Sequence, residues 1–141
     1  MFQNPFRQTA LIDQVLVLAK PDAVHNGKVG RILAMFERTH FWICNTRELQ
    51  MTNEFCAQHY RDHVNKPFYP SLVDFMTSGL TIAFHMQWVS NPKDMIPVAR
   101  ETVEAIRQIN LCQNPRNLVH ASSSIEAAQR ELTLWFPNSK N

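Results

Sequence analysis

The chain contains little glycine: its 141 residues include only Gly27, Gly30 and Gly79. It has no Walker A sequence, G-x-x-x-x-G-K-[ST], and no G-x-G-x-x-G. Both motifs bind phosphate through backbone N–H groups that glycine leaves accessible. A nucleotide-binding protein with this sequence would therefore have to hold phosphates with side chains.

Cysteines and long apolar runs are also scarce. Cys44, Cys56 and Cys112 form no C-x-x-C pair, so the usual zinc and redox motifs are not indicated. Three widely spaced thiols are typical of a reducing compartment, and we expect a cytoplasmic protein. No apolar run exceeds five residues, as at Val15–Ala19, which is too short to span a bilayer. The N-terminus lacks the pattern of a secretory signal.

The overall composition is that of an ordinary globular domain. Hydrophobic residues make up 45% of the chain, charged residues 18%, and the net charge is +2. This balance predicts neither specific nucleic-acid binding nor membrane association. We expect a loose N-terminal arm over residues 1–13 and a single domain over 14–141.

Hydrophobic periodicity and turn residues predict alternating strands and helices. The continuous apolar run Val15–Ala19 is typical of a strand that is covered on both faces. The other expected strands lie at 41–44, continuing less regularly toward 49, and at 80–84 and 118–120; the expected helices lie at 29–36, 52–63, 71–76, 98–109 and 125–134. This order predicts an α+β, ferredoxin-like split βαβ sandwich, with a four-stranded antiparallel sheet and helices on one face.

His120 is a candidate catalytic residue because of its position and its distance in sequence from Glu131. His120 ends the short strand at 118–120, and Glu131 follows eleven residues later, inside the last helix. An imidazole whose one nitrogen is held by a carboxylate can act as a nucleophile or a general base. Alone, His120 would more often be structural, so the hypothesis depends on the residues upstream.

Several cationic and imidazole side chains could complete such a site. Lys20 follows a central strand, and Arg100 and Arg107 share one face of the helix at 98–109. These three could neutralise a polyphosphate, although each taken singly is more often a solvated surface residue. His59 and His63 have metal-ligand spacing but no evident third ligand, so we interpret them as surface histidines and expect no protein-held metal.

Taken in order, the motifs resemble those of the nucleoside diphosphate kinase family from about Val15 to Pro137. The fragments that carry the resemblance are V-L-V-L-A-K-P-D-A-V at 15–24, Q-H-Y at 58–60, K-P-F-Y-P at 66–70, F-M-T-S-G at 75–79, N-L-V-H-A-S at 117–122 and E-L-T-L-W-F at 131–136. Each fragment alone is weak, but their order and spacing are specific. The chain is therefore identified as similar to this family.

The resemblance implies a ping-pong kinase. His120 would take the γ-phosphate of a nucleoside triphosphate on Nδ1 and pass it to a nucleoside diphosphate. The other roles implied are orientation of the imidazole by Glu131, a place beside it for Tyr60, phosphate binding by Lys20 and Arg107, base stacking on Phe68, and a sugar contact from Asn117. Gln113 falls where the family has a phosphate-binding threonine. Mg²⁺ would be held through the phosphates, and the chain would form a homo-oligomer, with a hexamer favoured.

The chain also departs from the family pattern. The long loop that family members carry before the histidine strand is shortened, as in certain viral members, because twelve residues separate Arg107 from His120. One register makes Arg107 the helix arginine and leaves the loop arginine without a counterpart. A second register makes Arg107 the loop arginine and Arg100 the helix arginine.

Ala121 and Ser123 stand where glycine and aspartate are usual. The alternative function is therefore a nucleotide-binding or interaction module of the same fold with weak or lost kinase activity.

Overall fold

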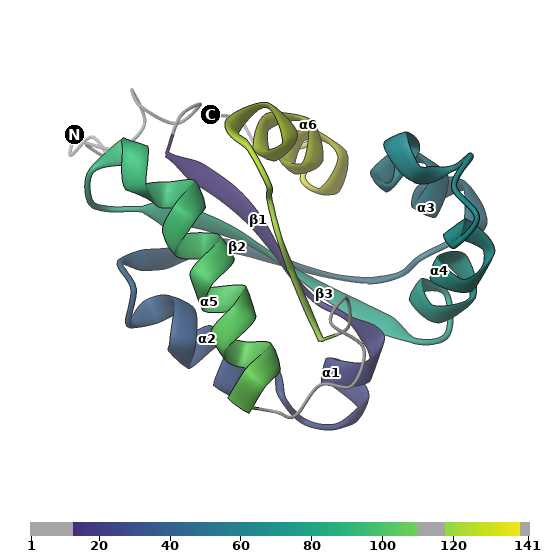
Figure 1. The fold of residues 1–141 in the computed structure, drawn as a ribbon, viewed down its shortest axis with the longest axis horizontal. Coiled ribbons are helices and arrows are strands. Elements are labelled where there is room, and N and C mark those ends of the chain that lie inside the picture. Colours follow the sequence, from purple (N-terminus) through teal and green to yellow (C-terminus); the bar gives the residue numbers. More distant parts are fainter. Residues whose placement is uncertain (1–12, 110–117, 139–141) are drawn as a thin grey trace.

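The computed structural model describes residues 13–109 and 118–138. These residues form a four-stranded antiparallel sheet in the order β2-β3-β1-β4 (Figure 1). The strands are β1 (Gln14–Ala19), β2 (Phe41–Gln50), β3 (Leu80–Trp88) and β4 (Val119–Ala121). Most of the expected arm, Cys112, Gln113 and Asn117 lie outside the described residues.

Six α-helices and two 3₁₀ turns connect the described strands. They are α1 (Pro21–His25), α2 (Val29–Glu37), α3 (Asn53–His59), α4 (Tyr69–Met76), α5 (Met95–Ile109) and α6 (Ile125–Trp135), with 3₁₀ turns at Arg61–His63 and Pro92–Asp94. The predicted ferredoxin-like antiparallel sheet is confirmed.

Helices cover both faces of the sheet, so the prediction of helices on one face is wrong. Val15, Val17 and Ala19 of β1 point into a core that includes side chains of α2 and α5. Leu16 and Leu18 point the other way, into a second core with residues from α3, α4 and α6. The cause is the continuous apolar run of β1, because alternate side chains of a strand face opposite sides and both sides then need cover.

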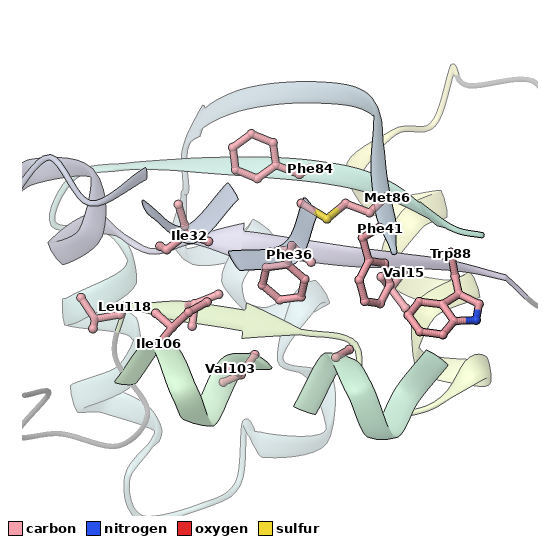
Figure 2. Packing of buried hydrophobic residues seen from close by; sticks show 14 of the residues in the cluster. Val15, Ile32, Phe36, Phe41, Phe84, Met86, Trp88, Val103, Ile106 and Leu118 are labelled. Atoms are coloured by element: carbon pink, nitrogen blue, oxygen red, sulfur yellow. The ribbon is translucent and has the colours of Figure 1, made fainter. Parts of the chain in front are cut away.

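The first core is rich in aromatic side chains. Figure 2 shows Phe36, Phe41 and Trp88 packed together between the sheet and the helices. The centroid of the Phe41 ring lies 5.5 Å from that of Phe36 and 4.9 Å from that of Trp88. These contacts fix α2 against the sheet on the side away from His120.

Several elements differ in length from their predicted ranges. The short helix α1 was not predicted, because Lys20-Pro21 reads as the end of a strand; in the structure Pro21 opens the helix, where its missing N–H costs nothing. The expected helix 52–63 ends at His59, with Thr52 as its N-cap, and continues as a 3₁₀ turn. Pro70 and Pro97 lie in the first turns of α4 and α5 instead of preceding them.

The entry into β4 is held by the segment that follows β1. Leu118 has a φ of 74°, a backbone conformation that costs energy for a residue with a branched side chain. Its N–H donates to both carboxylate oxygens of Asp22 at 3.1 Å, and its carbonyl accepts from the N–H of Lys20 at 2.9 Å. Asp22 thus stabilises the turn that begins the histidine-bearing strand.

Asp22→Ala should lower the free energy of unfolding by roughly 1.5–3 kcal/mol, because it removes hydrogen bonds to a charged acceptor at a strained residue. Urea unfolding followed by circular dichroism measures the change. Asp74→Ala, which removes an exposed carboxylate from α4, is the control and should have little effect. Equal stabilities of the two variants would show that Asp22 does not hold this turn.

Candidate active site

The site is built around the pairing of His120 with Glu131. Leu18 of β1 lies opposite His120 of β4, so both side chains point to the face that α6 covers. There the Nε2–H of His120 donates to Oε1 of Glu131 at 3.2 Å. The side chain of Glu131 is only 5% exposed and that of His120 is 20% exposed. The pairing that the eleven-residue spacing predicted is therefore present in the structure.

Ser122 holds the carboxylate from a second direction. Its hydroxyl donates to Glu131 Oε1 at 2.8 Å and accepts the backbone N–H of Leu16 at 3.0 Å. Ser124 accepts the N–H of Ala127 and caps α6, the helix that carries Glu131. Our sequence reasoning missed Ser122, although its position two residues after His120 places it on the same side of an extended chain.

The surroundings keep Glu131 ionised. Burial alone would raise the pKa of this carboxyl. The hydrogen bond of His120 and its charge when protonated, together with the hydroxyl of Ser122 and the charge that His59 gains at low pH, outweigh burial and lower the pKa to about 2. A permanent carboxylate acceptor at Nε2 favours the His120 tautomer whose hydrogen is on Nε2. The lone pair of His120 is then on Nδ1.

His59 is a buried neighbour of His120, so its interpretation as a surface histidine is wrong. The residue is 2% exposed, and the two ring centroids lie 5.1 Å apart at an interplanar angle of 76°. The indole N–H of Trp135 donates to Nδ1 of His59 at 3.0 Å. The available signal was its i, i+3 spacing from Cys56, because both residues lie on the buried side of α3.

Burial and neighbouring charge keep His59 uncharged. Burial is the largest cause that lowers the pKa of this imidazole, His120 is the next, and the result is a pKa of about 3. Lys20 and Arg130 act in the same direction, while Glu131 opposes them. Lys20 is itself buried, and its backbone N–H donates to the carbonyl of Leu118, two residues before His120.

Aromatic rings continue from His59 to the 3₁₀ turn and beyond. The centroid distances are 4.5 Å from His59 to Tyr60, 6.1 Å from Tyr60 to His63 and 5.5 Å from His63 to Phe68. The hydroxyl of Tyr60 is buried and has no hydrogen-bond partner among residues 13–109 and 118–138. The row of rings joins Phe68, at the start of α4, to His120.

The two arginines of α5 lie at a cavity on the other side of His120. Arg107 donates from Nη2 to the carbonyl of Val119 at 2.9 Å, and its Nη1 lies 3.6 Å from Glu104 Oε1. The cavity has a volume of about 230 Å³ and is lined by Arg100, Val103, Glu104, Arg107, His120, Ala121 and Ser123. Both arginines therefore line the same cavity as His120, whether Arg107 corresponds to the helix arginine or to the loop arginine of the family.

Residues 13–141 match the family described as "Nucleoside diphosphate kinase". The chain belongs to the nucleoside diphosphate kinase family. Its relatives include nucleoside diphosphate kinases of Nocardia farcinica, 36% identical over 90% of this chain and 96% of the relative, and of Rhodopirellula baltica, 38% identical over 89% and 86%. The nucleoside diphosphate kinase of Aquifex aeolicus has a similar structure, with a TM-score of 0.75 and 30% identity over 88% of this chain and 94% of that one.

Membership of the nucleoside diphosphate kinase family makes the chain a nucleotide-binding phosphotransferase. The family acts on nucleotide substrates and needs a divalent cation for activity. Among the described residues, no helix is both long and apolar enough to cross a membrane.

The buried, uncharged state of His59 predicts a dependence of stability on pH. The unfolded chain protonates His59 near pH 6.5, whereas the folded chain does so only near pH 3, so stability falls as the pH drops below 6.5. The contribution is about 1.4 kcal/mol for each pH unit between about pH 6 and 4. Glu131 contributes separately at lower pH, from about 4.5 down to about 2.

Urea unfolding at several pH values gives the slope of the free energy of unfolding against pH. The difference between this slope in the wild type and in His59→Asn measures the contribution of His59. The pKa of His85 is also lowered by burial, but His85 is present in both proteins and cancels in the difference. His25→Asn, at an exposed position, should keep the wild-type slope. Equal slopes for His59→Asn and wild type would mean that His59 ionises freely in the folded protein.

Proposed function

We propose that this nucleoside diphosphate kinase works by a ping-pong mechanism through a phosphohistidine at His120. Nδ1 of His120 attacks the γ-phosphorus of a nucleoside triphosphate, the Nδ1–P bond forms as the bond to the bridging oxygen breaks, and the nucleoside diphosphate leaves. A second nucleoside diphosphate then attacks the phosphohistidine and restores the imidazole. The observation that carries this proposal is the contact of Nε2 with Glu131, because it leaves the Nδ1 lone pair available.

The transferred group needs positive charge around it, and the described residues can supply it. We assign phosphate binding to Lys20 and Arg107, since Lys20 is buried beside the start of β4 and Arg107 lines the cavity beside His120. Cationic donors at these positions would stabilise charge on the equatorial oxygens of the transferring group. Gln113 and Asn117 remain proposed contacts to phosphate and to the sugar hydroxyl.

The row of rings supports a position for the nucleoside. We assign base stacking to Phe68, because it ends the row that begins at His120 and a ring face accepts any base. The triphosphate would then extend along this row toward the imidazole. The ring of Tyr60 lies within the row, and its buried hydroxyl supports a role for Tyr60 as a hydrogen-bond donor beside the phosphoryl group.

The divalent cation proposed for the reaction is Mg²⁺, bound through the nucleotide phosphates. In the described part of the chain, the one group of three potential ligands is His59, His120 and Glu131. Two nitrogens and one carboxylate oxygen, two of these side chains being buried, do not suit an ion that prefers oxygen and bound water. The residues present thus fit a cation that arrives with the nucleotide, and its chemistry would be charge neutralisation on the phosphates.

Arg100 is the candidate for the second phosphate-binding arginine of the site. It lines the same cavity as His120 and shares its helix face with Arg107. With the loop shortened, this arrangement would bring two guanidinium groups to the phosphates from a single helix. It favours an active kinase over a module with lost activity.

Three further assignments complete the proposal. The domain would span residues 14–141 after an arm at 1–13, a division supported by the family match over 13–141. A homo-oligomer is proposed, with a hexamer favoured, and the exposed Trp42 on the edge strand β2 (62% exposed) supports association but not a particular size. A cytoplasmic location is supported by the free thiols of Cys44 and Cys56.

Incubation with γ-³²P-labelled ATP should label the wild type in an acid-labile form, and His120→Ala should remain unlabelled because it lacks the accepting nitrogen. Phosphoenzyme is measured by gel autoradiography after alkaline and after acid treatment. His25→Ala is the matched control and should label like the wild type. Equal labelling of His120→Ala would exclude the mechanism, and nucleotide binding without any transfer to a diphosphate would favour the alternative module.

Arg100→Ala should reduce kcat/KM for ATP by about tenfold or more, which corresponds to losing roughly 1.5–3 kcal/mol of hydrogen bonding to a charged group. A coupled assay with a fixed second nucleotide measures kcat and KM. Arg38→Ala, at the exposed end of α2, serves as the control for loss of charge. If both variants match the wild type, Arg100 does not contact the phosphates.

A further inference from the structure

The most unusual feature beside the reacting group is a second imidazole that the mechanism above does not use. His59 is buried, its ring lies nearly perpendicular to that of His120, and one of its nitrogens is within 4.8 Å of both a nitrogen of His120 and a carboxylate oxygen of Glu131. A polar ring in such a place needs a reason, because an apolar ring of the same size could fill the space without desolvating nitrogen atoms.

Trp135 determines which nitrogen of His59 carries the hydrogen. The indole N–H is a donor only, Trp135 is fully buried, and its N–H is directed at Nδ1 of His59 at 3.0 Å. Nδ1 must therefore be the unprotonated acceptor, and the hydrogen of the neutral ring is on Nε2. The pKa of His59, lowered chiefly by burial to about 3, agrees with a ring that stays neutral near pH 7.

The same tautomer argues against a metal ion held by His59, His120 and Glu131. Metal ligation through Nε2 would require the hydrogen on Nδ1, where it would face the N–H of Trp135. A bound His usually donates its other N–H to an acceptor, and here the neighbouring group is a donor. The geometry therefore suits a neutral ring better than a ligand.

We propose that His59 is a positioning residue for His120: its uncharged ring, oriented by the indole of Trp135, packs edge-to-face with the imidazole and fixes the plane in which Nδ1 is presented to phosphate. This inference rests on the proposed role of His120 as phosphoryl acceptor. The hydrogen bond to Glu131 holds Nε2 at one point, but it leaves the ring free to rotate about the N–H···O axis. A second ring at 76° to the first restricts that rotation.

The absence of charge on His59 is part of this role. A protonated His59 would compete with His120 for the Glu131 carboxylate and would repel a protonated His120. The other charged groups that act on His59 are Lys20 and Arg130, and both oppose its protonation. Glu131 alone favours it. The neutral ring thus leaves the carboxylate to His120 and Ser122.

Two variants separate the ring from its hydrogen bond. His59→Phe keeps a ring against His120 but removes the acceptor of the Trp135 N–H. His59→Asn keeps an acceptor in reach of Trp135 but removes the ring. Rapid-quench measurement with labelled ATP gives the rate constant of phosphoenzyme formation, the labelled fraction of sites and the KM for ATP, and thermal unfolding gives Tm.

We expect His59→Asn to form phosphoenzyme about tenfold or more slowly at unchanged KM, because misplacing a reacting group by about 1 Å can cost a hundredfold. His59→Phe should retain a rate constant near that of the wild type, with a lower Tm from the unpaired indole N–H. A merely structural role would lower Tm and the labelled fraction in both variants without changing the rate constant. Wild-type kinetics in His59→Asn, or an equal loss in both variants, would overturn the proposal.

A measurement on the wild type covers the case in which a variant does not fold. Nitrogen-15 NMR of the imidazoles should show His59 with hydrogen on Nε2, an unprotonated Nδ1, and no titration between about pH 5 and 8. The opposite tautomer, or a titration in that range, would overturn the proposal. Failure of the wild type to form any phosphohistidine would instead reject the proposed function, so the two failures are distinguishable.

Discussion

The buried carboxylate of Glu131 is the group on which the site depends. A carboxylate taken out of water is strongly destabilised unless it is paired and hydrogen-bonded, and here His120 and Ser122 both donate to the same oxygen. That requirement fixes the positions of β4, of the capped start of α6 and of β1, whose Leu16 N–H orients Ser122. The orientation of the His120 imidazole thus follows from the need to stabilise one negative charge.

Because helices cover both faces of the sheet, the polar site and the apolar core can lie on opposite faces. The first core, between the sheet and helices α2 and α5, is almost entirely apolar and aromatic. The second core, under α3, α4 and α6, contains the polar cluster of His59, His120, Ser122 and Glu131 beside Trp135. Because the apolar face supplies most of the burial, the opposite face can accommodate ionisable groups.

The parts of the site that lie close in sequence or in a regular pattern could be predicted. The separation of His120 and Glu131 by one strand end and one helix was predictable, as were the four strands, because hydrophobic periodicity reports them directly. His59 could not be assigned from its spacing to His63, since its partners Trp135 and His120 come from distant segments. The cover on both faces could have been predicted from the continuous apolar run of β1, because both faces of such a strand must be buried.

The long sequence separation of these contacts has a consequence for how the enzyme is made. The hydroxyl of Ser122 bonds to Leu16 across 106 positions, and Trp135 bonds to His59 across 76. During synthesis, β1 and α3 leave the ribosome well before β4 and α6 exist, so no partly made chain contains the arrangement proposed to activate His120. Contacts of this range also form late in folding, because a large loop must close first. The arrangement of His120, Glu131 and His59 is therefore a property of the fully folded chain, and under the proposed mechanism a nascent or partly folded chain would not take phosphoryl groups from nucleotides.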